Sequence, residues 1–232
     1  MWRFLTEQAH KDGKLPSDLT VKKIMDTWTL QMGFPVVSVD RDYTSGSARI
    51  SQERFLVSKT KDNPDKHDYM WWIPITFTKP GGDFSATKNS IWMSDKEKSK
   101  VITGLPNSNT PVIFNLKETG YYRVNYDEKN WQLIIKQLNE DHRKIDVTNR
   151  AQIIDDAMNL ARSGLLDYKM ALGVTSYLHK ETEYIPWAAA LDGMSYLSSM
   201  LKRYFQSHNY TAVHCRARVR FIEDRGRILG IS

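Results

Sequence analysis

The apolar and polar residues of the chain follow two different periods, and the change between them lies at residues 119–127. Between residues 35 and 126, apolar and polar residues alternate in short segments, as they do in strands that bury one face. After residue 127, apolar residues recur at every third or fourth position, as in amphipathic helices. The stretch 119–127 therefore predicts the end of a sheet region and the beginning of a helical one.

This stretch contains the signals for both elements. One face of the predicted strand 121–126 is apolar and consists of Tyr122, Val124 and Tyr126. Gly120 lets the backbone turn into the strand without a Cβ clash. Asp127 is unfavourable in a strand, and its short carboxylate suits the N-cap of the next helix.

The region before it is rich in short strands. We predict strands at 35–40, 48–57, 69–78, 87–94, 99–103, 111–117 and 121–126, with turn-rich segments at 42–46, 61–65 and 80–83. Pro74 lies within the third strand and predicts an edge position or a bulge there. About seven short strands in about 90 residues predict a small all-β sandwich.

Helices are predicted on both sides of the strands. Two precede them, at 2–11 and at 20–31, with Thr20 as N-cap of the second. Four follow Asp127: the second of these spans about 148–163 and ends at Gly164, Asp167 caps the third, and Pro186 lies in the first turn of the fourth. Short connections make neighbouring helices antiparallel, so the sequence predicts an α-helical hairpin stack.

Residues 206–232 interrupt this helical pattern. Apolar residues alternate there with His and Arg, which is the period of a strand. His208, His214 and Cys215 lack a further ligand at zinc-finger spacing, so we interpret them as incidental rather than metal-binding. The arginines are more typical of a solvated tail than of a phosphate-binding surface. Asn209 begins an Asn-Tyr-Thr glycosylation pattern, which matters only in a secreted chain.

Composition excludes several classes of protein. The net charge is +6, and the five arginines and two acidic residues of 206–232 account for half of it. The remaining charge is too small for a nucleic-acid surface. A single Cys215 excludes an internal disulfide. No apolar run approaches the ~20 residues of a membrane span, and no signal peptide is recognisable, so the location expected of the chain as written is the cytoplasm.

Two pairs of carboxylates are candidates for acid–base chemistry. They are Asp155 with Asp156, and Glu181 with Glu183. Solvation of helix ends or salt bridges between domains is the interpretation we favour for both pairs. Neither a Gly-x-Ser-x-Gly nucleophile motif nor a phosphate-binding glycine loop occurs in the sequence.

Four stretches resemble the zinc aminopeptidases of the aminopeptidase N family: IMDTWTLQMGFPV at 24–36, TGYYRVNYD at 119–127, NRAQIIDDA at 149–157 and ETEYIPW at 181–187. Their order matches the middle of the family, and the resemblance covers about residues 2–204. It implies that 1–33 end a thermolysin-like catalytic domain, that 34–127 form the β-sandwich and that 128–205 begin an α-helical superhelix. The fold class is thus mixed and multidomain.

The tail and the zinc site depart from the family. We hypothesise that the divergent basic tail 206–232 comes from a retained intron, a frameshift or alternative splicing. The family binds zinc through two His one helical turn apart, with a Glu between them, and a further Glu. No two of the six His have that spacing, and the stretch His179-Lys180-Glu181-Thr182-Glu183 is the nearest imitation, without the second His. The glycine-rich Gly-x-Met-Glu-Asn segment is missing too, so we assign no catalytic, substrate-binding or metal-ligating residue to this chain.

The resemblance implies that the complete enzyme uses zinc to remove N-terminal residues from peptides, and that many members are plasma-membrane ectoenzymes. We predict that this chain is a non-catalytic fragment of such an enzyme, inactive alone. The alternative is an interaction or decoy module, or a dimerisation partner that associates through the helical region. Both ends are expected to expose apolar surface, which favours self-association.

Overall fold

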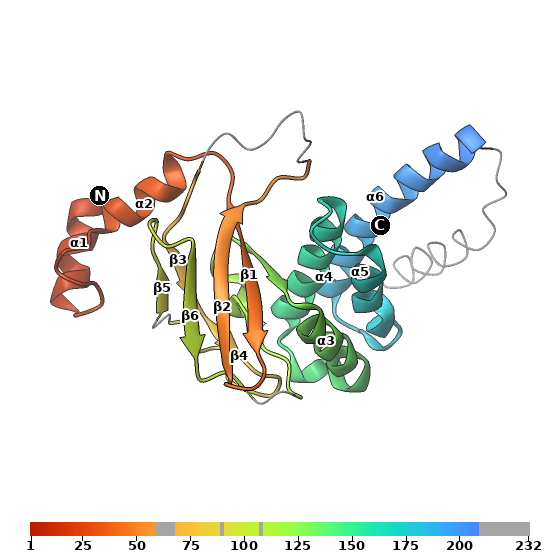
Figure 1. The fold of residues 1–232 in the computed structure, drawn as a ribbon, viewed down its shortest axis with the longest axis horizontal. Helices are drawn as coiled ribbons and strands as arrows, with labels where there is room; N and C mark the ends of the chain where they lie inside the picture. The colour runs from red at the N-terminus through yellow and green to blue at the C-terminus, as the bar shows by residue number, and fades with distance from the viewer. Residues whose placement is uncertain (59–67, 89–90, 107–108, 209–232) are drawn as a thin grey trace.

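The computed structural model describes residues 1–58, 68–88, 91–106 and 109–208, with side chains as far as Leu201. Its helices are α1 (Trp2–Lys11), α2 (Val21–Thr29), α3 (Glu128–Asp141), α4 (Val147–Arg162), α5 (Tyr168–Val174) and α6 (Tyr184–His208). The strands are β1 (Pro35–Asp42), β2 (Ser47–Arg54), β3 (Ile73–Ile75), β4 (Phe77–Thr78), β5 (Ile91–Met93), β6 (Ser99–Thr103), β7 (Ile113–Phe114) and β8 (Arg123–Tyr126). Helices α1 and α2 lie at one end, the strands in the middle and α3–α6 at the other end (Figure 1). The prediction of a mixed architecture is confirmed.

The main sheet has four strands in the order β6-β2-β1-β8. Strand β1 is antiparallel to β2, and β2 is antiparallel to β6. Strand β8 instead runs parallel to β1, with Val36 opposite Arg123 and Val39 opposite Tyr126. The last strand of the region therefore pairs with the first, and β3-β5 and β4-β7 form two further sheets of two strands each.

Several strands are shorter than the sequence predicts. The predicted strand 69–78 divides at Thr76, because its carbonyl and hydroxyl oxygens accept hydrogen bonds from the N–H groups of Asn115 and Leu116. The predicted strand 111–117 stops at Phe114, since Asn115 adopts a left-handed conformation before the 3₁₀ segment Leu116–Glu118. Pro74 lies in a two-stranded sheet, which confirms its edge position.

A single apolar core runs from the sheets into the helices. The rings of Phe114 and Tyr126 lie 6.3 Å apart, and Tyr126 meets Trp131 of α3 edge-on at 5.1 Å. Phe114 and Trp131 are fully buried. Burial of apolar surface stabilises folds by about 25 cal/mol per Å², so this continuous core fixes α3 firmly against the strands.

The predicted helix caps are confirmed. The side chains of Thr20, Asp127 and Asp167 accept hydrogen bonds from backbone N–H groups in the first turns of α2, α3 and α5. Gly164 has a φ of +77° just after the end of α4. Asp127 also accepts a hydrogen bond of 2.7 Å from the Tyr43 hydroxyl, which ties α3 to the segment that follows β1.

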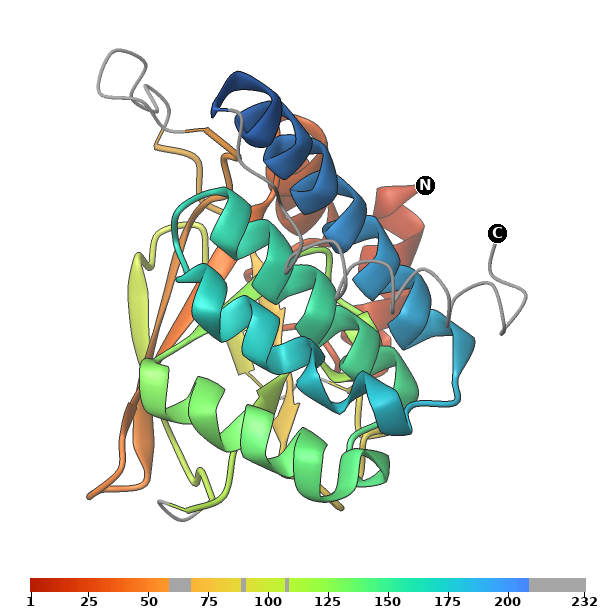
Figure 2. The ribbon, with the colours of Figure 1, turned by 90° about the vertical axis from the view of Figure 1, so that its right-hand side faces the viewer.

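Helix α4 is the centre of the helical region and packs against α5, α6 and β8. Figure 2 shows α3, α4, α5 and α6 on the side of the molecule that faces the viewer. Helix α6 continues to His208, so the predicted change of period at residue 206 is wrong for 206–208. No Gly or Pro between 194 and 208 ends the helix earlier. Residues 209–232, with Asn209, His214 and Cys215, lie outside the described residues.

Candidate functional site

Charged side chains from β8 and α4 meet at the junction between the sheet and the helices. Arg123 binds both Asp155 and Asp156, with 3.0 Å between its Nη1 and Asp156 Oδ1. The guanidinium also lies 5.7 Å from the ring centre of Phe34 and 5.1 Å from that of Phe55. Cation–π contacts of this kind favour the charged arginine where it is partly desolvated. The interpretation of Asp155 and Asp156 as salt-bridge partners is confirmed.

Asp156 is the most enclosed member of this cluster, at 4% exposure. Its Oδ2 accepts a hydrogen bond of 3.0 Å from the N–H of Val124, on the edge strand β8, and one of 3.4 Å from the Gln152 amide. Burial raises the pKa of Asp156 to about 7, while Arg123 and the Val124 N–H act in the opposite direction. The Asp156 carboxylate on α4 thus accepts a hydrogen bond from the edge strand β8, and its pKa lies near neutral pH.

The turn before β8 has an unusual backbone. Asn115, Lys117 and Glu118 have positive φ angles of 58°, 51° and 53°. Outside glycine this conformation costs on the order of 1–3 kcal/mol per residue, so the surrounding structure must compensate for it. Partial burial raises the pKa of Glu118, and the charge of Asp155 adds to that effect.

Two asparagines hold this turn in place. The Asn115 side chain accepts a 2.8 Å hydrogen bond from the Gly120 N–H and donates to the carbonyls of Gly120 and Tyr122. Asn149 of α4 accepts one of 2.8 Å from the Lys117 N–H and donates one of 3.0 Å to the Asn115 carbonyl. These bonds supply the local compensation that a left-handed backbone needs.

The packing around Gly120 leaves no room for a Cβ atom, in agreement with the prediction that glycine avoids a Cβ clash here. A Cβ at this position would lie 2.3 Å from Cε1 of Tyr122, well inside contact distance. The Tyr122 ring cannot withdraw easily, since it is buried and its hydroxyl donates a 2.9 Å hydrogen bond to the Pro74 carbonyl. Glycine is therefore required here for close packing rather than for its range of φ.

A second ion pair lies inside the helical region. Arg150 and Glu181 are joined at two points, and Tyr177 donates a further 3.0 Å hydrogen bond to Glu181 Oε2. The N–H groups of Thr182 and Glu183 donate to Oε1. Burial would raise the pKa of Glu181, but these hydrogen bonds outweigh it and the pKa lies below its usual value. Glu181 is thus a fully engaged structural anion.

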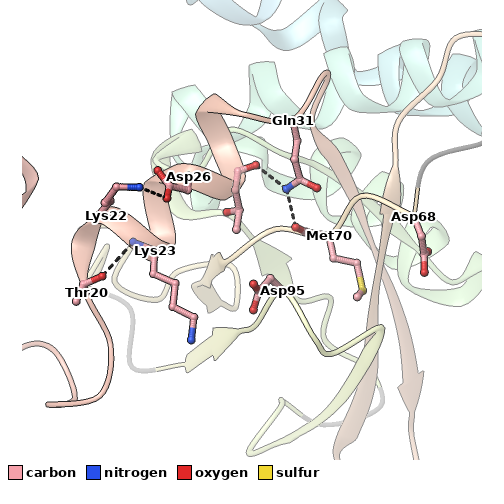
Figure 3. A pocket seen from close by; sticks show the side chains of 9 residues that line it. Thr20, Lys22, Lys23, Asp26, Gln31, Asp68, Met70 and Asp95 are labelled. Atoms are coloured by element: carbon pink, nitrogen blue, oxygen red, sulfur yellow. Dashed lines mark hydrogen bonds and ion pairs between the residues drawn. The ribbon is translucent and has the colours of Figure 1, made fainter.

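An open pocket of about 470 Å³ lies between α2 and the segments around Asp68 and Asp95 (Figure 3). Lys22 forms an ion pair with Asp26 on the same helix. The Gln31 amide donates two 2.8 Å hydrogen bonds, to the carbonyls of Thr27 and Met70. The pocket carries both signs of charge, and much of its polar surface is already paired, so it does not select one class of ligand.

The residues present do not fit a catalytic zinc. His179 is held by a 2.9 Å contact between its Nδ1 and the Ser176 carbonyl, and Glu181 is committed to Arg150. Across residues 1–58, 68–88, 91–106 and 109–201, whose side chains the structure describes, no three His, Cys, Asp or Glu side chains gather as metal ligands would. In the same residues, no helix is both long and apolar enough to cross a lipid bilayer.

Comparisons with known proteins agree with the sequence motifs. Residues 111–220 match the family model of the ERAP1-like C-terminal domain. Aminopeptidase Ey of Gallus gallus is 40% identical over 205 residues, and aminopeptidase N of Homo sapiens is 40% identical over 206. The chain belongs to the aminopeptidase N family. The thyrotropin-releasing hormone-degrading ectoenzyme of Rattus norvegicus is 36% identical over 208 residues.

The alignments with these three relatives each cover 88% of the chain but only 19–20% of the relative. The chain thus spans about a fifth of the length of the family members that it matches. All four motif stretches that carried the resemblance contribute to the described clusters: 24–36 holds Phe34, 119–127 holds Arg123, 149–157 holds Asp155 and Asp156, and 181–187 holds Glu181. These motif residues therefore have structural partners within the chain itself.

Proposed function

We propose that this chain is a non-catalytic scaffold segment of a membrane-associated zinc aminopeptidase. The observation that carries the proposal is the engagement of its buried carboxylates. Asp156 accepts hydrogen bonds from Arg123, Val124 and Gln152, and Glu181 from Arg150, Tyr177 and two backbone N–H groups. Groups so fully paired hold elements together, whereas a general base needs a position open to its substrate.

In the complete enzyme, the strands would form a β-sandwich and the helices the beginning of a superhelix that walls the substrate chamber. That enzyme would remove N-terminal residues from peptides with a zinc-activated water. The zinc ligands would come from other residues, since these 232 contain no His-Glu-x-x-His. The family resemblance supports a location of such an enzyme at the plasma membrane, facing the outside of the cell.

An aminopeptidase assay tests the scaffold role. The purified chain is incubated with aminoacyl chromogenic substrates, with and without added Zn²⁺ and a chelator, beside full-length human aminopeptidase N as positive control. We expect no turnover by the chain. Turnover that scales with its concentration, disappears with chelator and returns with zinc would overturn the proposal. The variants His179→Ala and Glu183→Gln would then show whether the nearest imitation of the zinc motif is responsible.

An interaction module or dimerisation partner is the alternative function. Its support is a set of exposed apolar side chains near the N-terminal helices and at the start of α6. Leu30 and Met32 are 75% and 65% exposed near the N-terminal helices, and Tyr184 and Ile185 are 62% and 48% exposed at the start of α6. Patches of exposed apolar residues often mark protein contacts. Association of the purified chain with the full-length enzyme or with itself, without hydrolysis, would favour this function.

A further inference from the structure

The hydrogen-bond partners of Asp156 are all donors. Nη1 of Arg123 donates to Oδ1, and the Val124 N–H and the Gln152 amide donate to Oδ2. The site is therefore arranged for an ionised carboxylate, although only 4% of the residue is exposed and burial opposes the charge. A proton added to Oδ2 would meet two N–H groups and no acceptor among these partners.

A rotation of the Gln152 amide would resolve that conflict. Its Nε2 now donates to Asp156, and its Oε1 accepts a 2.7 Å hydrogen bond from Asn149 Nδ2. Rotation would offer Oε1 to the protonated Asp156 and turn Nε2 toward the donor of Asn149. The donor–donor contact would thus pass about two helical turns along α4, from Asp156 through Gln152 to Asn149.

Asn149 is the residue that holds the left-handed turn. If its amide rotates as well, Nδ2 faces the Lys117 N–H and Oδ1 faces the Asn115 carbonyl, so both hydrogen bonds to the turn are lost. Lys117 and Glu118 have no intrinsic preference for positive φ, and these bonds oppose their relaxation. The turn and the carboxylate are therefore linked by an unbroken row of side-chain amides.

We propose that Asp156, Gln152 and Asn149 form a proton-controlled latch: ionised Asp156 keeps the turn 115–118 closed against α4, and its protonation opens the turn. The latch connects the sheet to the helical region, because the turn precedes β8 and is bound to Asn149 of α4. It would operate whether or not the chain is part of a peptidase, so its test is separate from the activity assay.

Several charged or titratable groups surround Asp156 and contribute to the balance. Arg123 favours the ionised form, and Asp155 on the same helix opposes it. Two tyrosines of the neighbouring strand segment, Tyr122 and Tyr126, are buried beside the carboxylate with raised pKa values and stay neutral. Glu118 lies beside Asp155 and Arg123 rather than against Asp156 itself. Asp156 is the group among these that contacts Gln152.

Amide hydrogen exchange of the full chain, followed by NMR between pH 5 and pH 8, tests the latch. After correction for the intrinsic exchange rate, we expect the Lys117 N–H to be less protected at pH 5 than at pH 8, by at least about fivefold, as for the loss of one or two hydrogen bonds. Asp156→Asn should make this protection independent of pH. Asp155→Asn is the matched control, because it removes a partner of the same arginine without touching Gln152, and it should keep the pH dependence.

A measurement on the unmodified chain covers the case in which Asp156→Asn does not fold. The ¹³C shift of the Asp156 carboxyl and the ¹⁵N shifts of the Gln152 side chain and the Lys117 amide should titrate with one midpoint. In Gln152→Met, the carboxyl should still titrate while Lys117 no longer responds. A Lys117 amide that ignores the titration of Asp156 in the unmodified chain would overturn the latch, as would pH-dependent protection retained in Asp156→Asn.

Discussion

Arg150 and Glu181 form a two-point ion pair, with 2.7 Å between Nε and Oε2 and 3.2 Å between Nη2 and Oε1. The Glu181 side chain is completely buried and that of Arg150 is 6% exposed. Arg150 also donates a 2.7 Å hydrogen bond to the Ile145 carbonyl at the start of the α4 region. The pair therefore joins the beginning of α4 to the segment that leads into α6.

Removing one partner of this pair should be strongly destabilising. Arg150→Met leaves the Glu181 carboxylate buried without its cation, and we expect a loss of about 3–5 kcal/mol in the free energy of unfolding, measured in urea. The double variant Arg150→Met/Glu181→Met should lose less than Arg150→Met. Lys136→Ala is the control, since its pair with Glu140 is 70% and 62% exposed and is worth at most about 1 kcal/mol. Equal losses in the buried and exposed pairs would contradict the structural role.

The pH dependence of stability should carry the signature of Asp156. Its pKa is about 7 in the folded protein and about 3.9 in an unfolded chain, so the folded state binds more protons between these values. The contribution of Asp156 to the free energy of unfolding is therefore fully present below about pH 4 and is lost as the pH rises through 7. The difference between the unmodified chain and Asp156→Asn should decrease by a few kcal/mol over this range, given about 1.4 kcal/mol per pKa unit.

The contribution of Asp42 to stability should change with pH in the opposite direction to that of Asp156. The hydrogen bond from Ser45 lowers the pKa of this exposed carboxylate, so its contribution is present at higher pH and is lost as the pH falls through the folded pKa. The difference in the free energy of unfolding between the unmodified chain and Asp42→Asn, measured in urea, should therefore increase as the pH rises. If the differences for Asp156→Asn and for Asp42→Asn change with pH in the same direction, the burial of Asp156 is not what sets its pKa.

In the unmodified chain, acid should raise the global free energy of unfolding through Asp156 while it weakens the hydrogen bonds that hold the turn at Lys117.

Lys117→Gly should be neutral or stabilising by up to about 1 kcal/mol. Lys117 has a φ of +51°, where glycine escapes the Cβ strain, and this gain offsets the greater entropy of glycine in the unfolded chain. Lys136→Gly, in the middle of α3, is the control and should lose about 1 kcal/mol. Thermal unfolding of the two variants compares them directly, and equal losses at both sites would argue against strain in the turn.

Self-association should depend on the exposed apolar residues. At micromolar concentration we expect the chain to elute as more than a monomer, measured by light scattering on a sizing column. If the helical region carries the contact, Tyr184→Ser/Ile185→Ser should restore the monomer. The matched control Leu30→Ser/Met32→Ser changes residues of similar exposure at the other end and should not. A monodisperse monomer of the unmodified chain would exclude this association.

Local features of the fold could be predicted from the sequence, and long-range features could not. The caps Thr20, Asp127 and Asp167 act on backbone N–H groups two or three residues away, so short-range chemistry suffices to find them. The parallel pairing of β8 with β1 joins opposite ends of the strand region, and no alternation of residues indicates it. The division of the strand 69–78 at Thr76 depends on a turn that is remote in sequence.

The same distinction applies to the charged junction. Asp155 and Asp156 stand out in the sequence as adjacent acids, but their partner Arg123 lies on another element and is found only through the fold. The left-handed backbone at Lys117 and Glu118 has no sequence signal, since neither residue favours that conformation. A glycine at either position would have indicated a positive φ. Among the turn residues with positive φ, only Asn115 is of a type that adopts this conformation readily.

The parallel partnership of β1 and β8 has a consequence for how the chain is made. Strand β1 leaves the ribosome with one side unmatched, and its second neighbour is translated only after the other strands have passed. Closing such a distant pairing carries an entropic penalty that local hairpins avoid, which slows folding. Until Tyr126 is synthesised, the unpaired edge of β1 can pair with strands of other chains. We therefore expect nascent chains that lack β8 to aggregate more readily than the folded protein and to depend more on chaperones.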